Sequence, residues 1–195
     1  MSSLYYRSPL APDERPDIYI EADEQGLTGL WFVDQVDSRK ESGTDGDATK
    51  ETDAQKDAML RRLSSPQALE KPEKVADTVL KMAISWLDLY FSGKVPDFIP
   101  PLHPSGSKFQ LLVWSYLLDI PYGKTATYGD LAKRAARDLG KKAMSAQAIG
   151  GAMGRNPISL IVPCHRVVGA GGKLTGYGGG LWRKEELLEM ESQHR

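Results

Sequence analysis

The chain has 195 residues, of which 41% are apolar and 26% are charged, as in ordinary globular proteins. This composition excludes a fibrous or wholly disordered protein, and no run of about 18 apolar residues exists to span a bilayer. Charged residues and prolines interrupt residues 1–20, which therefore lack the apolar core of a signal peptide. We expect a cytoplasmic protein that does not associate with membranes.

The net charge of -1 hides two halves of opposite sign. Residues 105–195 carry 13 Lys and Arg against 7 Asp and Glu, whereas residues 1–104 carry 12 against 19. A basic C-terminal half favours a polyanionic partner such as nucleic acid. A solvated basic surface explains the same asymmetry equally well.

The N-terminal part predicts a small sheet followed by a helix. Two β-rich runs, residues 18–22 and 27–33, flank a turn that contains Gly26, which is typical of a hairpin. Polar and charged residues dominate from about residue 35 to 65, so we expect a mobile insertion there. Apolar residues then recur with helical spacing over 75–90, and Gly93 can end that helix.

A proline-rich connection predicts where the domains divide. Residues 95–104 contain four prolines, which stiffen an extended segment, and the sign of the charge changes at the same place. We therefore expect an N-terminal α/β domain over residues 1–100 and a second domain over residues 105–195.

The second domain predicts three helices in succession. Apolar spacing marks the first over 109–117, which Pro121 stops, and a capping-box pattern of Thr127 and Asp130 begins the second. A third helix is expected over 145–153 after a short polar turn. The last two helices form a helix-turn-helix unit.

The third of these helices has an almost bare surface, because Ala146, Ala148, Gly150, Gly151 and Ala152 are all small. Glycine in a helix interior costs about 1 kcal/mol relative to alanine, so something must approach this backbone closely. Tight packing against a neighbouring helix is one explanation. Docking into a DNA groove is the other, with phosphates met by nearby cations such as Lys133, Arg134 and Arg155.

Cys164 is the only cysteine, which excludes an intramolecular disulfide and a zinc site built on several thiolates. A short apolar strand is expected over 158–162, immediately before Pro163 and Cys164. A lone buried cysteine is usually a small apolar residue. The turn at Pro163 and the adjacent His165 and Arg166 instead favour a nucleophile, because cations favour the thiolate. An acid from residues 185–191 that orients His165 would complete a Cys-His-acid relay like those of thiol hydrolases.

Several motifs together resemble the O6-alkylguanine-DNA alkyltransferase family. They are Pro163-Cys164-His165-Arg166-Val167, Gly154-Arg155-Asn156-Pro157, the Gly176-Tyr177-Gly178 loop, the segment that begins at Lys184, and residues 120–132. The resemblance covers residues 105–191 strongly and the N-terminal hairpin and helix only loosely. It implies an RNase H-like sheet in a small N-terminal α/β domain, and a mostly helical C-terminal domain with a helix-turn-helix.

The resemblance also implies a function: irreversible, single-turnover transfer of the alkyl group of O6-alkylguanine, or of O4-alkylthymine, from double-stranded DNA to Cys164 after base flipping. In that reaction Glu191 holds His165, which deprotonates Cys164 through a water, Tyr128 supplies a proton to the base, and Asn156 joins the recognition helix to the active-site segment. The DNA contacts implied are Ser145, Ala146, Gln147, Gly150, Gly151, Arg155, Lys133 and Arg134. The substrate pocket implied comprises Tyr177, Gly178, Pro163 and Val167. Gln147 stands where many members have an arginine.

Neither a cofactor nor a metal is expected, and we expect a monomer. Two other functions remain open from the sequence. One is a protein that binds alkylated DNA without repairing it, against which Cys164 argues. The other is a Cys-His-Glu hydrolase, which would turn over many times, whereas an alkyltransferase is consumed.

Overall fold

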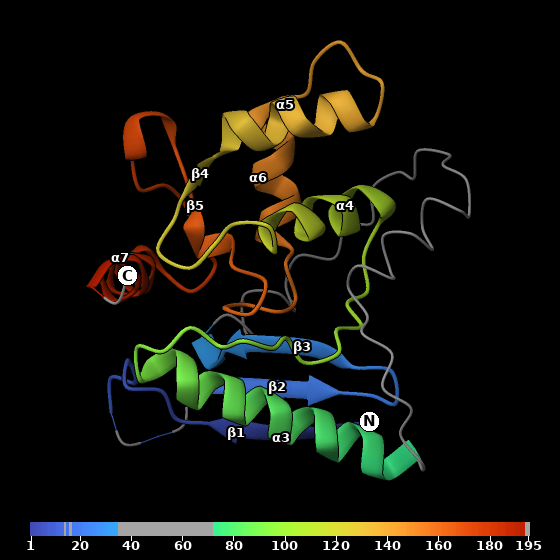
Figure 1. Ribbon diagram of the computed structural model, residues 1–195, viewed down its shortest axis with the longest axis vertical. Coiled ribbons are helices and arrows are strands. Elements are labelled where there is room, and N and C mark those ends of the chain that lie inside the picture. Colours follow the sequence, from blue (N-terminus) through green and yellow to red (C-terminus); the bar gives the residue numbers. More distant parts are fainter. Residues whose placement is uncertain (14, 16, 35–71, 194–195) are drawn as a thin grey trace. The chain divides into compact units, whose positions relative to one another are not determined.

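The computed structural model describes residues 1–13, 15, 17–34 and 72–193 (Figure 1). The chain divides into two compact units. The first comprises Met1–Ser105 with Pro157–Ser159, and the second comprises Gly106–Asn156 with Leu160–Arg195. The expected polar insertion lies outside the described residues. Helices and strands occur together, so the prediction of a mixed α/β fold is confirmed.

A three-stranded antiparallel sheet forms the first unit together with one long helix. The strands β1 (Ser2–Tyr6), β2 (Ile18–Ala22) and β3 (Leu27–Phe32) pair in chain order. Their alternating side chains Ile18 and Ile20 are fully buried on one face, where helix α3 (Pro72–Phe91) contacts the strands. The predicted hairpin is confirmed, because β2 and β3 pair antiparallel.

Helix α3 confirms the predicted helix and begins three residues before its first predicted residue. Gly93 ends it, as predicted, because its φ of 78° suits glycine. The Gly93 and Lys94 N–H groups donate to the last carbonyls of the helix, those of Tyr90 and Leu89. Strand β1, by contrast, is not predicted from the sequence.

Two other segments join the edge of this sheet. The Leu27 N–H donates to the Pro101 carbonyl at 2.7 Å, and the Leu27 carbonyl accepts from the His103 N–H at 2.7 Å. On the same strand, Leu30 exchanges hydrogen bonds with the segment Pro157–Ser159, donating to the Pro157 carbonyl and accepting from the Ser159 N–H, both at 2.8 Å.

The second unit contains the helices α4 (Lys108–Leu117), α5 (Tyr128–Asp138), α6 (Ala146–Gly154) and α7 (Leu181–Gln193). Between them lie the parallel pair β4 (Ala126–Thr127) and β5 (Val167–Val168) and the 3-10 helices η1 (Cys164–Arg166) and η2 (Ala170–Gly172). The three predicted helices are confirmed as α4, α5 and α6. Thr127 and Asp130 form the predicted capping box, in which Thr127 accepts from the Asp130 N–H and Asp130 accepts from the Thr127 N–H.

The predicted strand over 158–162 is wrong. Only Ile158 forms a bridge, with Leu30, and the chain then turns at Leu160, whose φ is 68°. Every residue of this segment is nonetheless buried. The apolar run reports burial, and burial alone does not separate a strand from an inward-facing turn.

Candidate functional site

A short turn of chain holds Cys164 at the start of η1. The Cys164 N–H donates to the Val162 carbonyl at 2.8 Å, and the Cys164 carbonyl accepts from the Val167 N–H. Asn156, which follows α6, is buried and donates through Nδ2 to the Cys164 Sγ at 3.3 Å and to the Val162 carbonyl at 2.8 Å. The amide of Asn156 therefore fixes both the sulfur and the turn that carries it.

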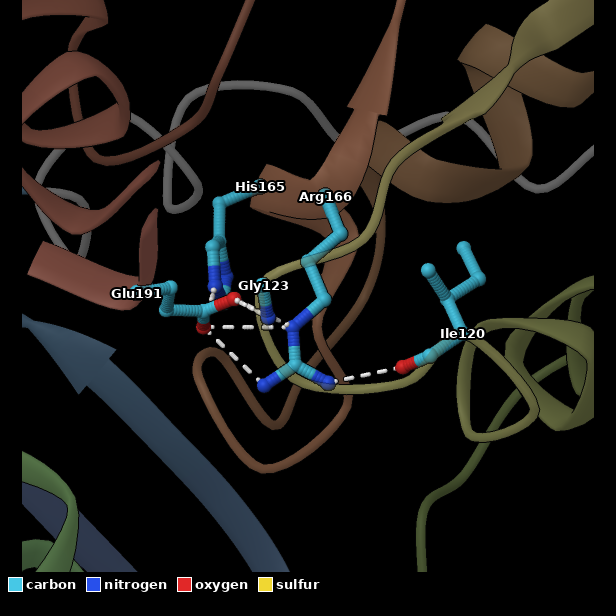
Figure 2. A network of polar contacts seen from close by, with 5 residues as sticks. All are labelled: Ile120, Gly123, His165, Arg166 and Glu191. Carbon is cyan, nitrogen blue, oxygen red and sulfur yellow. Dashed lines mark hydrogen bonds and ion pairs between the residues drawn. The ribbon is translucent and has the colours of Figure 1, made fainter. Parts of the chain in front are cut away.

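Beside the thiol lies a buried ionic network, which Figure 2 shows from close by. Glu191 of α7 accepts a hydrogen bond from His165 Nε2 at 2.8 Å, and both side chains are fully buried. The Arg166 guanidinium contacts the same carboxylate through Nε and Nη2 at 2.9 to 3.1 Å. The Gly123 N–H donates to Glu191 at 3.0 Å, and Arg166 Nη1 donates to the Ile120 carbonyl at 2.8 Å.

Charge and burial compete in this network. Burial alone would raise the pKa of Glu191, but the hydrogen bonds and charges of His165 and Arg166 outweigh it and lower this pKa to about 2. Burial lowers the pKa of His165 below its usual 6.5 despite the adjacent carboxylate. At neutral pH the network therefore holds an ionised Glu191 and a neutral His165, whose Nε2–H faces the carboxylate.

These pKa shifts predict loss of stability in acid. The pKa of Glu191 is depressed from 4.5 to about 2, so its contribution to the free energy of unfolding is complete above pH 4.5 and is lost as the pH falls toward 2. The lowered pKa of His165 acts in the same direction, starting below pH 6.5. Denaturant titrations at pH 7, 5 and 3 should show a fall of about 2 kcal/mol from Glu191 alone, almost all of it between pH 5 and pH 3. Equal free energies of unfolding at pH 7 and pH 3 would contradict this.

Arg166 and Lys184 have roles that the sequence does not reveal. The sequence places the charge of Arg166 beside the thiol, but its guanidinium is directed to Glu191, where the carboxylate balances it. Lys184 of α7 is fully buried, and its Nζ donates to the carbonyls of Val167 at 2.6 Å and Thr175 at 2.9 Å. No local pattern in the sequence separates this lysine from the other helical lysines.

The loop before α7 contributes Tyr177 and Gly178 to the surroundings of the thiol. The Tyr177 ring packs edge-on against His165, with 6.3 Å between ring centroids. Burial raises the pKa of Tyr177, and the negative charge of Cys164, when its thiol is ionised, raises it further. Pro163 and Val167, the other two predicted pocket residues, flank η1 and are buried.

Tyr128 begins α5 and connects three parts of the unit. Its hydroxyl donates to the Gly176 carbonyl at 3.5 Å, at the long limit for a hydrogen bond. A Cβ added at Gly150 of α6 would lie 3.7 Å from the Tyr128 ring. The structure therefore places Tyr128, the first residue of α5, next to α6 and next to the loop that contains Tyr177.

Helix α6 buries one face and exposes the other. Ile149, Ala152 and Met153 are buried, and the Ala152 carbonyl accepts from Trp114 Nε1 at 2.9 Å. On the exposed face, a Cβ added at Gly151 would meet no described atom within 4 Å. Packing against a neighbouring helix thus explains the small Ala152 but not Gly151. The predicted DNA contacts Ser145, Ala146 and Gln147 share this exposure.

The predicted phosphate contacts fall into two groups. Lys133 and Arg155 are exposed, whereas Arg134 contacts Asp119 at 2.6 Å and lies 4.1 Å above the centre of the Tyr116 ring. Arg134 thus helps to join α4 to α5.

In the described part of the chain, no cluster of three or more His, Cys, Asp or Glu could hold a metal ion, and no helix is long and apolar enough to cross a membrane.

Comparison with known proteins identifies this arrangement. Residues 108–193 match the family model described as 6-O-methylguanine DNA methyltransferase, DNA binding domain. A methylated-DNA–protein-cysteine methyltransferase of Mycobacterium leprae is 50% identical over 109 residues, which are 56% of this chain and 63% of that relative. One from Methanosarcina acetivorans is 51% identical over 105 residues, 54% of this chain and 64% of the relative. The matches therefore span less than two thirds of the length of these relatives.

Solved structures extend the similarity to both units. The crystal structure of Mycobacterium tuberculosis O6-methylguanine methyltransferase has a TM-score of 0.65 and 33% identity, covering 100% of this chain and 95% of that one. The M. tuberculosis OGT structure in complex with DNA has a TM-score of 0.61 and 34% identity, covering 91% and 87%. The chain therefore belongs to the family of O6-methylguanine-DNA methyltransferases, also named methylated-DNA–protein-cysteine methyltransferases.

Proposed function

We propose that the chain repairs double-stranded DNA by transferring the alkyl group of O6-alkylguanine irreversibly to Cys164, one group per molecule. O4-alkylthymine is a second proposed substrate. The observation that carries the proposal is the position of Cys164, hydrogen-bonded by Asn156 and adjacent in η1 to a His165 that Glu191 orients. Family membership and the similarity to a DNA complex support it.

Activation of the thiol follows from the tautomer of His165. Because Nε2–H faces Glu191, Nδ1 is the nitrogen that accepts a proton, and it takes the Cys164 proton through a water. Glu191 stays ionised and stabilises the imidazolium that forms, as the acid of a catalytic triad does. Asn156 donates to the resulting thiolate.

Transfer is an SN2 displacement at the alkyl carbon. The Cys164 sulfur forms a bond to that carbon as the bond from the carbon to guanine O6 breaks, and the bonding pair remains with the base. Guanine is a poor leaving anion, so Tyr128 donates a proton to the base as it departs. The position of Tyr128 beside the Gly176 carbonyl, next to the loop of Tyr177 and Gly178, supports this role. The products are a neutral thioether and guanine, and the imidazolium of His165 and the tyrosinate of Tyr128 return to their neutral forms by proton exchange with water.

The exposed face of α6 is the proposed DNA contact. Ser145, Ala146, Gln147, Gly150 and Gly151 let the helix backbone approach the minor groove, while Arg155, Lys133 and Arg134 meet phosphates. The target base is then flipped into the pocket of Tyr177, Gly178, Pro163 and Val167. Because Arg134 already pairs with Asp119, its phosphate contact requires exchange of that partner.

A large side chain at Gly151 should separate folding from DNA binding. For Gly151→Leu we expect an unchanged or higher Tm, because leucine favours helix over glycine by up to about 1 kcal/mol and open space surrounds this position. DNA affinity should fall about tenfold, equivalent to about 1.4 kcal/mol. Reaction with free O6-benzylguanine, which involves no duplex, is the control and should be unchanged. Unaltered affinity for duplex DNA would show that this face of α6 does not contact the DNA.

Gln147 should limit the stability of the flipped state. Gln147→Arg adds a charge and a longer donor at the place of the extruded base, so we expect tighter DNA binding at low salt and a steeper salt dependence. Fluorescence anisotropy with a lesion duplex at two salt concentrations measures both. Gln147→Met is the matched control, with similar length and no donor. Equal or weaker binding of the arginine variant would contradict the prediction.

Other features belong to the same proposal. Residues 1–100 are proposed as an N-terminal α/β domain with an RNase H-like sheet, and residues 105–195 as the DNA-binding and alkyl-acceptor domain. We place the protein in the cytoplasm as a monomer.

Titration with a lesion duplex tests the proposed function. Repair should stop at one lesion per chain. Continued turnover would identify a hydrolase, and binding without repair would identify a damage-recognition protein.

A further inference from the structure

Lys184 presents an unusual arrangement, a fully buried ammonium group hydrogen-bonded to neutral groups. Its Nζ donates to the Val167 and Thr175 carbonyls. In the described part of the chain these two carbonyls are its side-chain partners, and neither carries a charge to balance the ammonium. Burial of a charge without a counter-charge is costly, so the arrangement calls for an anion.

The other cationic side chains of this part of the chain have contacts of their own. Arg166 shares three contacts of 2.9 to 3.1 Å with Glu191, which balances its charge. Arg183 donates to the Gly179 carbonyl, and its guanidinium lies 4.5 Å from the centre of the Trp182 ring. Burial lowers the pKa of His165, which is therefore neutral at pH 7.

Val167 links Lys184 to the turn that carries Cys164. The Val167 carbonyl accepts from Lys184 Nζ, while the Val167 N–H donates to the Cys164 carbonyl. The ammonium therefore lies on the turn that carries the sulfur. Burial lowers the pKa of Lys184, and a thiolate at Cys164 opposes that shift, so the two charges interact.

We propose that Lys184 is the counter-ion of the Cys164 thiolate: a positioning residue whose buried positive charge favours ionisation of the sulfur before DNA arrives. His165 accepts the proton of the thiol and passes it on to solvent, so that it is again neutral beside the thiolate. Two other side chains interact with the sulfur, Asn156 and Tyr177, and neither carries a net charge at neutral pH. Glu191 and Arg166 balance each other. The purpose of this ionisation rests on the proposed alkyl transfer, but the ionisation itself does not.

The first test uses the whole protein without DNA. Because Cys164 is the sole cysteine, the rate of its alkylation by iodoacetamide from pH 5 to 10 reports the ionisation of one sulfur. The wild-type midpoint should lie below the unperturbed thiol value of about 8.5. A wild-type midpoint at or above that value overturns the proposal, whether or not any variant folds. If the midpoint is lowered as expected but the protein does not repair lesion DNA, the proposed function is wrong and the counter-ion role of Lys184 stands.

Lys184→Met tests the residue itself, because methionine keeps the length of the side chain and removes its charge. The midpoint should rise by at least about one pH unit, which corresponds to a tenfold smaller ionisation constant of the thiol. Lys173→Met is the matched control: it removes an exposed lysine from the glycine-rich segment that precedes α7 and should leave the midpoint unchanged. An unchanged midpoint in the folded Lys184→Met protein, or an equal rise in the control, overturns the proposal.

The proposal has a consequence for the spent protein. Methylation converts the thiolate to a neutral thioether and leaves the Lys184 ammonium buried without its counter-charge. Methylation of Cys164 should therefore lower the Tm of the wild type more than it lowers the Tm of the Lys184→Met protein. The steric effect of the methyl group is common to both proteins, so the difference reports the loss of the counter-charge. Equal losses of Tm in the two proteins would contradict a counter-ion role.

Discussion

Replacing Cys164 with serine is expected to abolish methyl transfer to the protein while lesion DNA still binds. A serine hydroxyl is not ionised at neutral pH and is a far weaker nucleophile toward an alkyl carbon than a thiolate. The exposed face of α6 is untouched by the change. Electrophoresis of a methylated duplex should show binding within about twofold of the wild type, a difference well below the 1.4 kcal/mol of a tenfold change.

Methyl transfer by the serine variant would place the acceptor elsewhere in the chain. Loss of DNA binding in the same variant would mean that Cys164 contributes to the fold of the binding surface. Circular dichroism of Cys164→Ser separates these two outcomes, because a folded variant without binding and an unfolded one differ in helix content.

Replacing Glu191 with glutamine should have the second large effect. Glu191 accepts hydrogen bonds from His165, Arg166 and the Gly123 N–H. Glutamine has no negative charge, so the buried guanidinium of Arg166 would lose the charge that balances it. Loss of one partner from a buried ion pair lowers the free energy of unfolding by about 3 to 5 kcal/mol. The transfer rate should fall by about 100-fold or more, because His165 loses the group that fixes its tautomer.

Glu189→Gln is the matched control for Glu191. Glu189 lies two residues earlier in α7 but is exposed, and its carboxylate accepts only a 3.3 Å bond from Gln193 among the contacts shown in the described chain. We expect its transfer rate and denaturant midpoint to equal those of the wild type. If Glu191→Gln also kept its rate in a single-turnover assay, Glu191 would not orient the base.

Local signals in the sequence predict most of the helices. The apolar spacing of α3 and α4 and the capping box of Thr127 and Asp130 lie within a few residues of the structure they specify. The motif around Cys164 likewise indicates His165 and Glu191 through the family resemblance. The structure brings both side chains to 2.8 Å from one another.

Features that depend on distant contacts are not predictable in the same way. Strand β1 exists through its pairing with β2, and the buried segment after Asn156 turns at Leu160 rather than extending as a strand. The direction of the Arg166 side chain depends on Glu191, 25 residues later in the chain. Lys184 is an ordinary helical lysine in the sequence, and only its burial against two carbonyls distinguishes it.

The mass of the intact protein after reaction with DNA that contains O6-methylguanine tests the central claim most directly. The account predicts the gain of one methyl group per chain, located on Cys164 by peptide mapping, with one lesion lost for each molecule modified. A folded protein that removes the lesion without gaining mass, or that carries the methyl group on another residue, would contradict it.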